Sequence, residues 1–101
     1  MNCTVASGSA IGGTIEYTIE VTDGTDYQSE TGRVLYNAVN KGGTVTRTIT
    51  EDADTTQALS SGTLATTWAI SNANPAVISV NADTSLASPS AGYPRITYNV
   101  S

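Results

Sequence analysis

Carboxylates, tyrosines and one cysteine are the side chains of this sequence with the most evident capacity for chemistry. The 101 residues include a single cysteine, Cys3, and no histidine. Catalysis near neutral pH most often uses histidine as its acid or base, and a cysteine nucleophile needs a base beside it. Zinc and copper sites would also lack their usual ligands. The sequence therefore predicts a protein that is not an enzyme, with no catalytic residue, no metal site and no cofactor.

Acidic side chains gather at two places. Glu51, Asp52 and Asp54 bring three carboxylates together, and Asp23 with Asp26 forms a weaker group. Oxygen ligands bunch in this way in calcium loops, but neither spacing matches the twelve-residue loop with its glycine and terminal glutamate. Solvated loop carboxylates are the preferred interpretation, and cation binding by residues 51–54 stays an open alternative.

Aromatic side chains could stack on a sugar ring. The sequence has one tryptophan and five tyrosines. Trp68, Tyr17 and Tyr98 alternate in step with aliphatic residues, as does Tyr36, so a place in the core is predicted for them. Tyr27 and Tyr93 lie in predicted connections and are the aromatic residues left free for a ligand or partner.

Alternation of apolar and polar residues is the strongest structural signal. In residues 14–22, Ile15, Tyr17, Ile19 and Val21 alternate with polar residues, which places the two kinds on opposite faces of a strand. The pattern returns along the chain with turn signals at short spacing. We predict an all-β fold, a single Ig-like β-sandwich of about seven antiparallel strands.

The expected elements follow from where this alternation begins and ends. Strands are predicted over residues 3–6, 14–22, 27–30, 33–39, 44–50, 63–71, 76–81 and 94–100. Gly32 is expected to break the chain between two of these strands, and residues 40–43 are expected to close a hairpin with a four-residue loop. The longest loop is predicted over residues 51–62, and a second long connection over residues 83–93.

The predicted core takes one apolar face from each strand. Its members are Ile15, Tyr17, Ile19, Val21, Val34, Tyr36, Val45, Ile49, Leu64, Trp68, Ile70, Ile78, Val80, Ile96, Tyr98 and Val100. Arg47 shares the parity of Val45 and Ile49, and an edge or rim position is its preferred interpretation because a buried guanidinium needs a partner.

Two parts make up the predicted domain organisation. Residues 1–13 read as a flexible N-terminal arm, because residues 7–13 are rich in glycine and serine, and residues 14–101 form the sandwich domain. The arm is expected to dock on a neighbouring subunit by adding a strand to a sheet edge, with Val5 and Ile11 as apolar anchors. A disordered tail is the alternative. Val5, Ile11, Tyr27 and Tyr93 are therefore the candidate partner-binding residues.

Charge narrows the range of partners. The net charge is −5 and 13% of residues are charged. Nucleic acids and anionic lipids both require a basic patch, so neither partner is expected. No secretory signal and no membrane span is recognisable, and Met1 is interpreted as the start of a complete small gene product.

A resemblance follows from these features together. A histidine-free, Thr-rich β domain with strands such as TIEYTIEVT, an acidic DGTDYQ turn and a closing RITYNV strand resembles the small virion proteins of bacteriophages that decorate heads or build necks and tails. The resemblance implies a non-enzymatic structural subunit, assembled in the host cytoplasm, that packs against other virion proteins in a homo-oligomeric or symmetric assembly.

Two alternatives from other classes stay open. One is a carbohydrate-binding or adhesin-type module of a surface protein, which would be favoured if Tyr27 and Tyr93 were exposed side by side. The other is an isolated repeat of a surface protein.

Overall fold

The chain folds into antiparallel β-strands. The structure is a computed structural model that describes the backbone of residues 3–51 and 55–100 and the side chains of residues 6–51 and 55–100. Within these residues every strand pairing is antiparallel and there is no helix, which confirms the all-β prediction. The eight strands are β1 (Cys3–Val5), β2 (Ser9–Thr22), β3 (Tyr27–Lys41), β4 (Thr44–Glu51), β5 (Thr56–Leu59), β6 (Leu64–Ile70), β7 (Ala76–Thr84) and β8 (Arg95–Val100).

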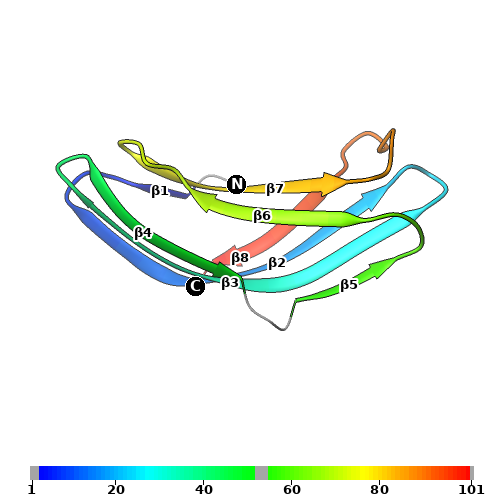
Figure 1. Cartoon of the computed structure of the whole chain (residues 1–101), viewed down its shortest axis with the longest axis horizontal. Helices are drawn as coiled ribbons and strands as arrows, with labels where there is room; N and C mark the ends of the chain where they lie inside the picture. Colours follow the sequence, from blue (N-terminus) through cyan, green and yellow to red (C-terminus); the bar gives the residue numbers. More distant parts are fainter. Residues whose placement is uncertain (1–2, 52–54, 101) are drawn as a thin grey trace.

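The strands form two sheets that pack face to face (Figure 1). One sheet has the order β1-β7-β6; the other has the order β4-β3-β2-β8, with β5 pairing to β3 beyond the end of β4. The rings of Tyr17 on β2 and Trp68 on β6 pack against each other between the two sheets, with their centroids 5.1 Å apart. The strand order differs from that of an immunoglobulin domain, whose sheets group strands 1-2-5-4 and 3-6-7.

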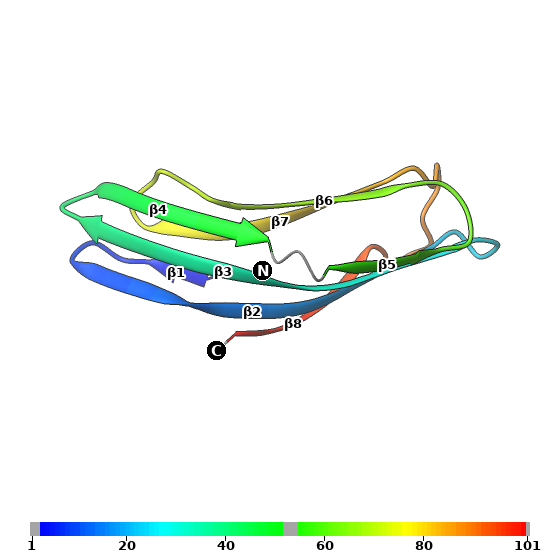
Figure 2. The same ribbon diagram turned by 60° about the horizontal axis from the view of Figure 1, so that its bottom comes forward.

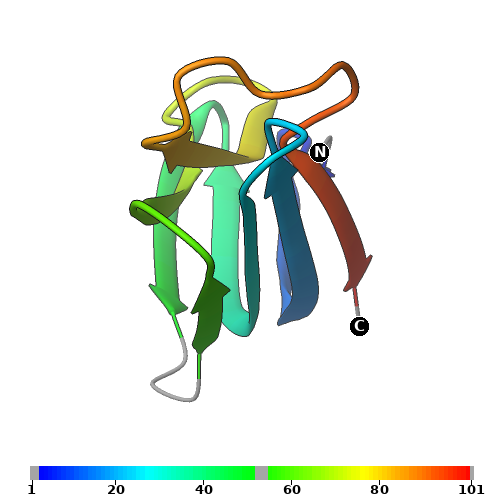
Figure 3. The ribbon, with the colours of Figure 1, turned by 90° about the vertical axis from the view of Figure 1, so that its right-hand side faces the viewer.

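The molecule is long and flat, with extents of 49 × 26 × 18 Å. Figure 2 shows how β2 and β3 run the length of the five-stranded sheet while the smaller sheet lies along one side of it. Figure 3, which looks along the molecule, shows β8 at one side of the larger sheet. In this sheet β8 pairs with β2 alone, so its other edge is unpaired in the described chain.

One core lies between the sheets, and most of the predicted members are in it. Its buried apolar residues are Ile15, Tyr17, Ile19, Val21, Val34, Tyr36, Ala38, Val45, Leu64, Trp68, Ile70, Ala76, Ile78 and Leu86. Ile49, Val80 and Ile96 are partly buried against it. Tyr98 and Val100 were predicted to be core residues and are exposed instead. Arg47 is exposed, as the rim interpretation requires.

The N-terminal segment differs from the predicted separate arm. Residues 3–5 pair with β7, and β2 begins at Ser9 and pairs with β3 from there to Thr22. Gly12 and Gly13, which the sequence placed in a flexible segment, pair in the ladder with Asn37 and Tyr36 of β3. A Cβ at Gly12 would lie 2.6 Å from Oδ1 of Asn37 on the neighbouring strand.

Gly32 does not break β3, which was a wrong prediction. The strand runs unbroken from Tyr27 to Lys41, and a Cβ at Gly32 would lie 2.7 Å from Oγ1 of Thr55 and 2.9 Å from the Tyr17 hydroxyl oxygen. Glycine is therefore needed here for close packing rather than for a turn.

Two connections also differ from expectation. The β3–β4 hairpin is confirmed, but Lys41 pairs with Thr44, so its loop is the two residues Gly42 and Gly43, both with positive φ. This is the backbone geometry of a tight primed turn. The predicted loop over residues 51–62 contains a strand, β5. It pairs with the part of the β3 edge that β4 does not reach.

Candidate functional site

Tyr27 and Tyr93 line the same surface cavity. Its volume is about 620 Å³, and its wall also includes Glu20, Leu59 and Ser60. Tyr27 is the first residue of β3 and is 62% exposed, and Tyr93 lies in the connection before β8 and is half-buried. The two tyrosines that the sequence left free for a ligand are thus neighbours in space, although they are far apart in the chain.

Hydrogen bonds hold the backbone at Tyr27. Its N–H donates to Oγ of Ser60 at 2.8 Å, and the Ser60 N–H donates back to the Tyr27 carbonyl at 2.9 Å. The Ser60 hydroxyl in turn donates to Oδ1 of Asp26 at 3.1 Å. The start of β3 is therefore tied to the segment that follows β5.

Arg95 holds the Tyr93 ring. Its Nη2 donates to the Tyr93 hydroxyl at 3.0 Å and to Oε2 of Glu20 at 3.2 Å, and its Cζ lies 4.9 Å from the centre of the Tyr93 ring. A guanidinium at this distance from an aromatic ring is attracted by the ring's negative face. Glu20 and Tyr93, two side chains of the cavity wall, are therefore linked to each other through Arg95 of β8.

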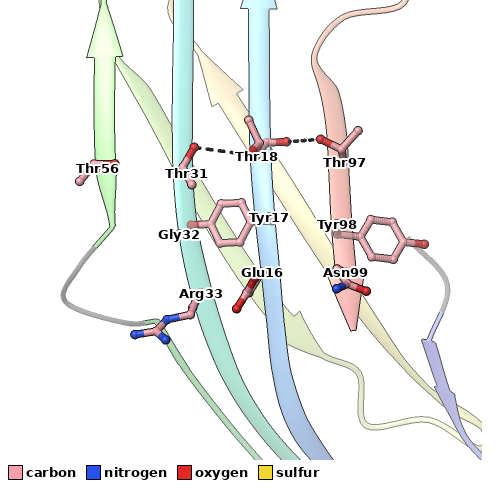
Figure 4. Close-up of a pocket in the computed structure, with 10 residues that line it drawn as sticks. All are labelled: Glu16, Tyr17, Thr18, Thr31, Gly32, Arg33, Thr56, Thr97, Tyr98 and Asn99. Atoms are coloured by element: carbon pink, nitrogen blue, oxygen red, sulfur yellow. Dashed lines mark hydrogen bonds between the residues drawn. The ribbon is translucent and has the colours of Figure 1, made fainter. Parts of the chain in front are cut away.

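A second cavity, also of about 620 Å³, lies further along the same sheet (Figure 4). Four threonines stand in register across it, one each on β5, β3, β2 and β8: Thr56, Thr31, Thr18 and Thr97. The Thr18 and Thr31 hydroxyl oxygens lie 3.4 Å apart, and the Thr97 hydroxyl donates to the Thr18 carbonyl at 3.5 Å. Such a row offers a partner hydrogen-bond donors and acceptors, and hydroxyls do not titrate near neutral pH.

The apolar face of β8 is a third candidate surface, here named the β8 row: Ile96, Tyr98 and Val100. These residues pair in register with Ile19, Tyr17 and Ile15 of β2, which are buried. Tyr98 is nevertheless 46% exposed and Val100 37% exposed, and the Tyr98 ring extends past β8, away from β2 (Figure 4). The row combines exposed apolar side chains with a strand edge that the described chain leaves unpaired.

A carboxylate is buried between the sheets. Glu30 is 4% exposed, and it accepts hydrogen bonds from the Tyr17 hydroxyl at 2.9 Å and from Nε2 of Gln57 at 2.6 Å. The same Gln57 nitrogen donates to the Leu64 carbonyl at 2.7 Å. Burial, followed by the hydrogen bond to Glu30, raises the pKa of Tyr17 to about 12. This cluster ties β5 and the start of β6 to the core and serves the fold.

The acidic residues do not form a metal centre within residues 3–51 and 55–100, where no three carboxylates, cysteines or histidines come together. Asp52 and Asp54 of the candidate cation loop lie outside the described residues. Asp23 accepts the N–H groups of Thr25 at 2.9 Å and Asp26 at 2.7 Å, and the Asp26 bond, followed by that of Thr25, lowers its pKa. This is the hydrogen bonding of an aspartate that closes a turn.

The candidate partner-binding residues do not form one site. The Ile11 side chain is partly buried against the chain's own core. Val5 lies in β1, where it pairs with Ala76. Ile11 is far from Tyr27. Tyr27 pairs with Thr22 at the other end of β2, and the strand from Ile11 to Thr22 is about 36 Å long at the usual rise per residue. Among the three of these residues whose side chains the structure describes, Tyr27 and Tyr93 come together in one cavity.

The sequence did not predict the β8 row or the buried Glu30. The burial of Glu30 could have been predicted from the alternation of β3. If the strand is continued through Gly32, Gln28 and Glu30 fall on the same inward face as Val34. The exposure of the β8 row has no such signal, since its alternation is the same as that of a buried strand.

Comparison with protein-family models, with curated proteins and with solved structures finds no match to this chain. Among the described residues, no helix is long and apolar enough to cross a membrane. The geometry of the chain is therefore the basis for assigning its function.

Proposed function

We propose that this protein is a non-enzymatic structural subunit of a bacteriophage virion, of the head-decoration, neck or tail type, and that it works by packing in many copies against itself and other virion proteins. The β8 row is the observation that carries the proposal. Two of its members are large apolar side chains more than a third exposed, on an edge strand whose outer side is unpaired in the described chain.

An unpaired strand edge is a template for another chain, and proteins usually protect it with charges, bulges or a covering segment. The only charged residue of β8 is Arg95, which is already engaged with Glu20 and Tyr93. Apolar side chains beside such an edge gain from a partner, because association removes their surface from water. An exposed apolar strip of this kind marks an interaction surface.

The outer face of the same sheet adds a second area suited to packing. Leu35 and Val39 of β3 are exposed there and stand in register with Thr50 and Thr46 of β4. All four side chains are uncharged, so a contact centred on them would bury no charge. Contacts on both an edge and a face would let one subunit touch more than one neighbour, as a shell or tube requires.

The proposal is tested on assembled particles. An antibody against the purified chain is used to probe particles isolated from the source culture, and quantitative mass spectrometry measures the copies per particle. We expect many copies at a fixed ratio to the major shell protein. A chain that stays with the free protein fraction, with no copies on particles, would contradict the proposal.

A matched pair of variants tests the role of the β8 row. Tyr98→Lys places a charge in the row, and Thr67→Lys places one on an exposed position of β6. We expect the Tyr98→Lys chain to fold but to be lost from particles, and the Thr67→Lys chain to enter them normally. Normal incorporation of both would show that another surface makes the contact.

A further inference from the structure

We infer that the cavity between Tyr27 and Tyr93 is a binding site for a neutral pyranose sugar. This site is separate from the β8 row and goes beyond the packing role proposed above. The volume of about 620 Å³ falls in the range of small-molecule sites.

The apolar part of the site suits the flat face of a sugar ring. Tyr27 is 62% exposed, so much of its side chain is accessible, and Tyr93 and Leu59 contribute to the same cavity. One face of a pyranose presents C–H groups, which pack well on aromatic rings, and its rim presents hydroxyls. A pair of tyrosines in one cavity therefore fits this ligand class better than a purely apolar molecule, because the walls are mixed.

The polar part of the site suits the hydroxyls. Glu20, Thr18 and Ser29 lie in the cavity wall at alternate, outward positions of β2 and β3. Arg95 binds Oε2 of Glu20, and no described residue is bonded to Oε1, which leaves its lone pairs for ligand O–H donors. Hydrogen bonds to a carboxylate are stronger than those between neutral groups.

The site is held in place before a ligand arrives. The Ser60 bonds fix the backbone at Tyr27, and Arg95 stacks on the Tyr93 ring while also bonding its hydroxyl. A ligand would not have to order the Tyr93 ring or the backbone at Tyr27, which reduces the conformational entropy lost on binding.

Charge selects a neutral sugar over an acidic one. Arg95, which bonds both Glu20 and Tyr93 of the wall, is already paired with the Glu20 carboxylate. Asp26, the residue before Tyr27, adds a carboxylate that accepts a hydrogen bond from Ser60. The protein as a whole carries a net charge of −5. An anionic glycan would therefore meet repulsion without an unpaired cation to offset it.

The test is a calorimetric titration of the purified full chain with cellotriose, maltotriose and tri-N-acetylchitotriose as neutral probes, and sialyllactose as an anionic one. We expect at least one neutral probe to bind with a dissociation constant of about 1 mM or below. Tyr27→Ala and Tyr93→Ala should each weaken that binding about tenfold or more. Glu20→Gln should weaken it less, because an amide oxygen still accepts a hydrogen bond.

The matched control is Tyr98→Ala, which removes another exposed tyrosine, from the β8 row, and should leave sugar binding unchanged. Circular dichroism checks that each variant is folded. The inference is overturned if no neutral probe binds at about 10 mM, if sialyllactose binds as well as the neutral probes, or if Tyr98→Ala is as damaging as Tyr27→Ala. Each result is obtained on the free chain, so it is independent of whether the chain is found on particles.

Discussion

Tyr17 and Tyr98 are direct neighbours in the same sheet, on the same face, and have opposite environments. They pair in register across β2 and β8, yet Tyr17 is 3% exposed and Tyr98 is 46% exposed. Trp68 of the other sheet packs on Tyr17 with ring centres 5.1 Å apart. The smaller sheet has three strands and the larger one five, and β8 lies at the side of the larger sheet (Figure 3). Burial is thus set by what lies opposite a residue.

The next inward-facing pairs along β2 and β8, on either side of Tyr17 and Tyr98, show the same contrast. Ile15 and Ile19 of β2 are fully buried, whereas their β8 partners are Val100, which is exposed, and Ile96, which is half-buried. One strand therefore completes the core of the chain, and the next strand in the sheet presents a similar set of side chains to solvent. The β8 row resembles half of a core, and a partner would supply the other half.

Removing the cover over Tyr17 should have the largest effect. Trp68→Ala deletes the side chain that packs on Tyr17, and we expect it to lower the free energy of unfolding by about 3–5 kcal/mol. Urea denaturation followed by circular dichroism measures the change. Tyr98→Ala, the corresponding truncation on β8, should change stability by no more than about 0.5 kcal/mol. Equal losses would mean that β8 is covered in solution.

The two tyrosine hydroxyls provide a finer test. Tyr17→Phe removes a donor to the buried Glu30 carboxylate, so we expect a loss of about 1–3 kcal/mol. Tyr98→Phe removes an exposed hydroxyl and should have almost no effect. Thermal unfolding of both variants at neutral pH makes the comparison, and a stable Tyr17→Phe protein would show that Gln57 alone satisfies the carboxylate.

Alkaline pH should distinguish the buried tyrosine as well. The pKa of Tyr17 is raised from 10.0 to about 12 in the folded protein, mainly by burial. The folded state therefore holds a proton that the unfolded state has lost between these values, and stability falls as pH rises. This contribution is fully present below pH 10 and is lost as the pH passes through about 12. The difference in unfolding free energy between the unmodified chain and Tyr17→Phe should shrink over that window, and a constant difference would contradict it.

A small effect on stability is also expected for Tyr98→Lys. The side chain is exposed and its replacement should change the unfolding free energy by about 0.5 kcal/mol or less. Self-association of the purified chain should nevertheless fall, because the charge would be buried in any contact over the β8 row. Sedimentation equilibrium measures this, with Thr67→Lys as the control. Loss of folding would show that the row is part of the chain's own core.

Much of the fold could be predicted because a strand alternates its side chains regardless of what surrounds it. This periodicity located β6 and Trp68, the long hairpin of β3 and β4, and the inward face of β2. Glycine was harder to interpret. Gly42 and Gly43 do form a turn with positive φ, whereas Gly12 and Gly32 lie inside strands, where an added Cβ would meet the side chains of Asn37 and Thr55.

The candidate sites depended more heavily on three-dimensional packing. The sequence identified Tyr27 and Tyr93 as the aromatic residues outside the core pattern, but their shared cavity results from β3 beginning where the last connection arrives. It placed Tyr98 and Val100 in the core because a local pattern shows which face a side chain takes and carries no information about the width of the opposite sheet. That width follows from long-range pairing of β1, β7 and β6, and it is why one face of β2 is buried while the same face of β8 is left open.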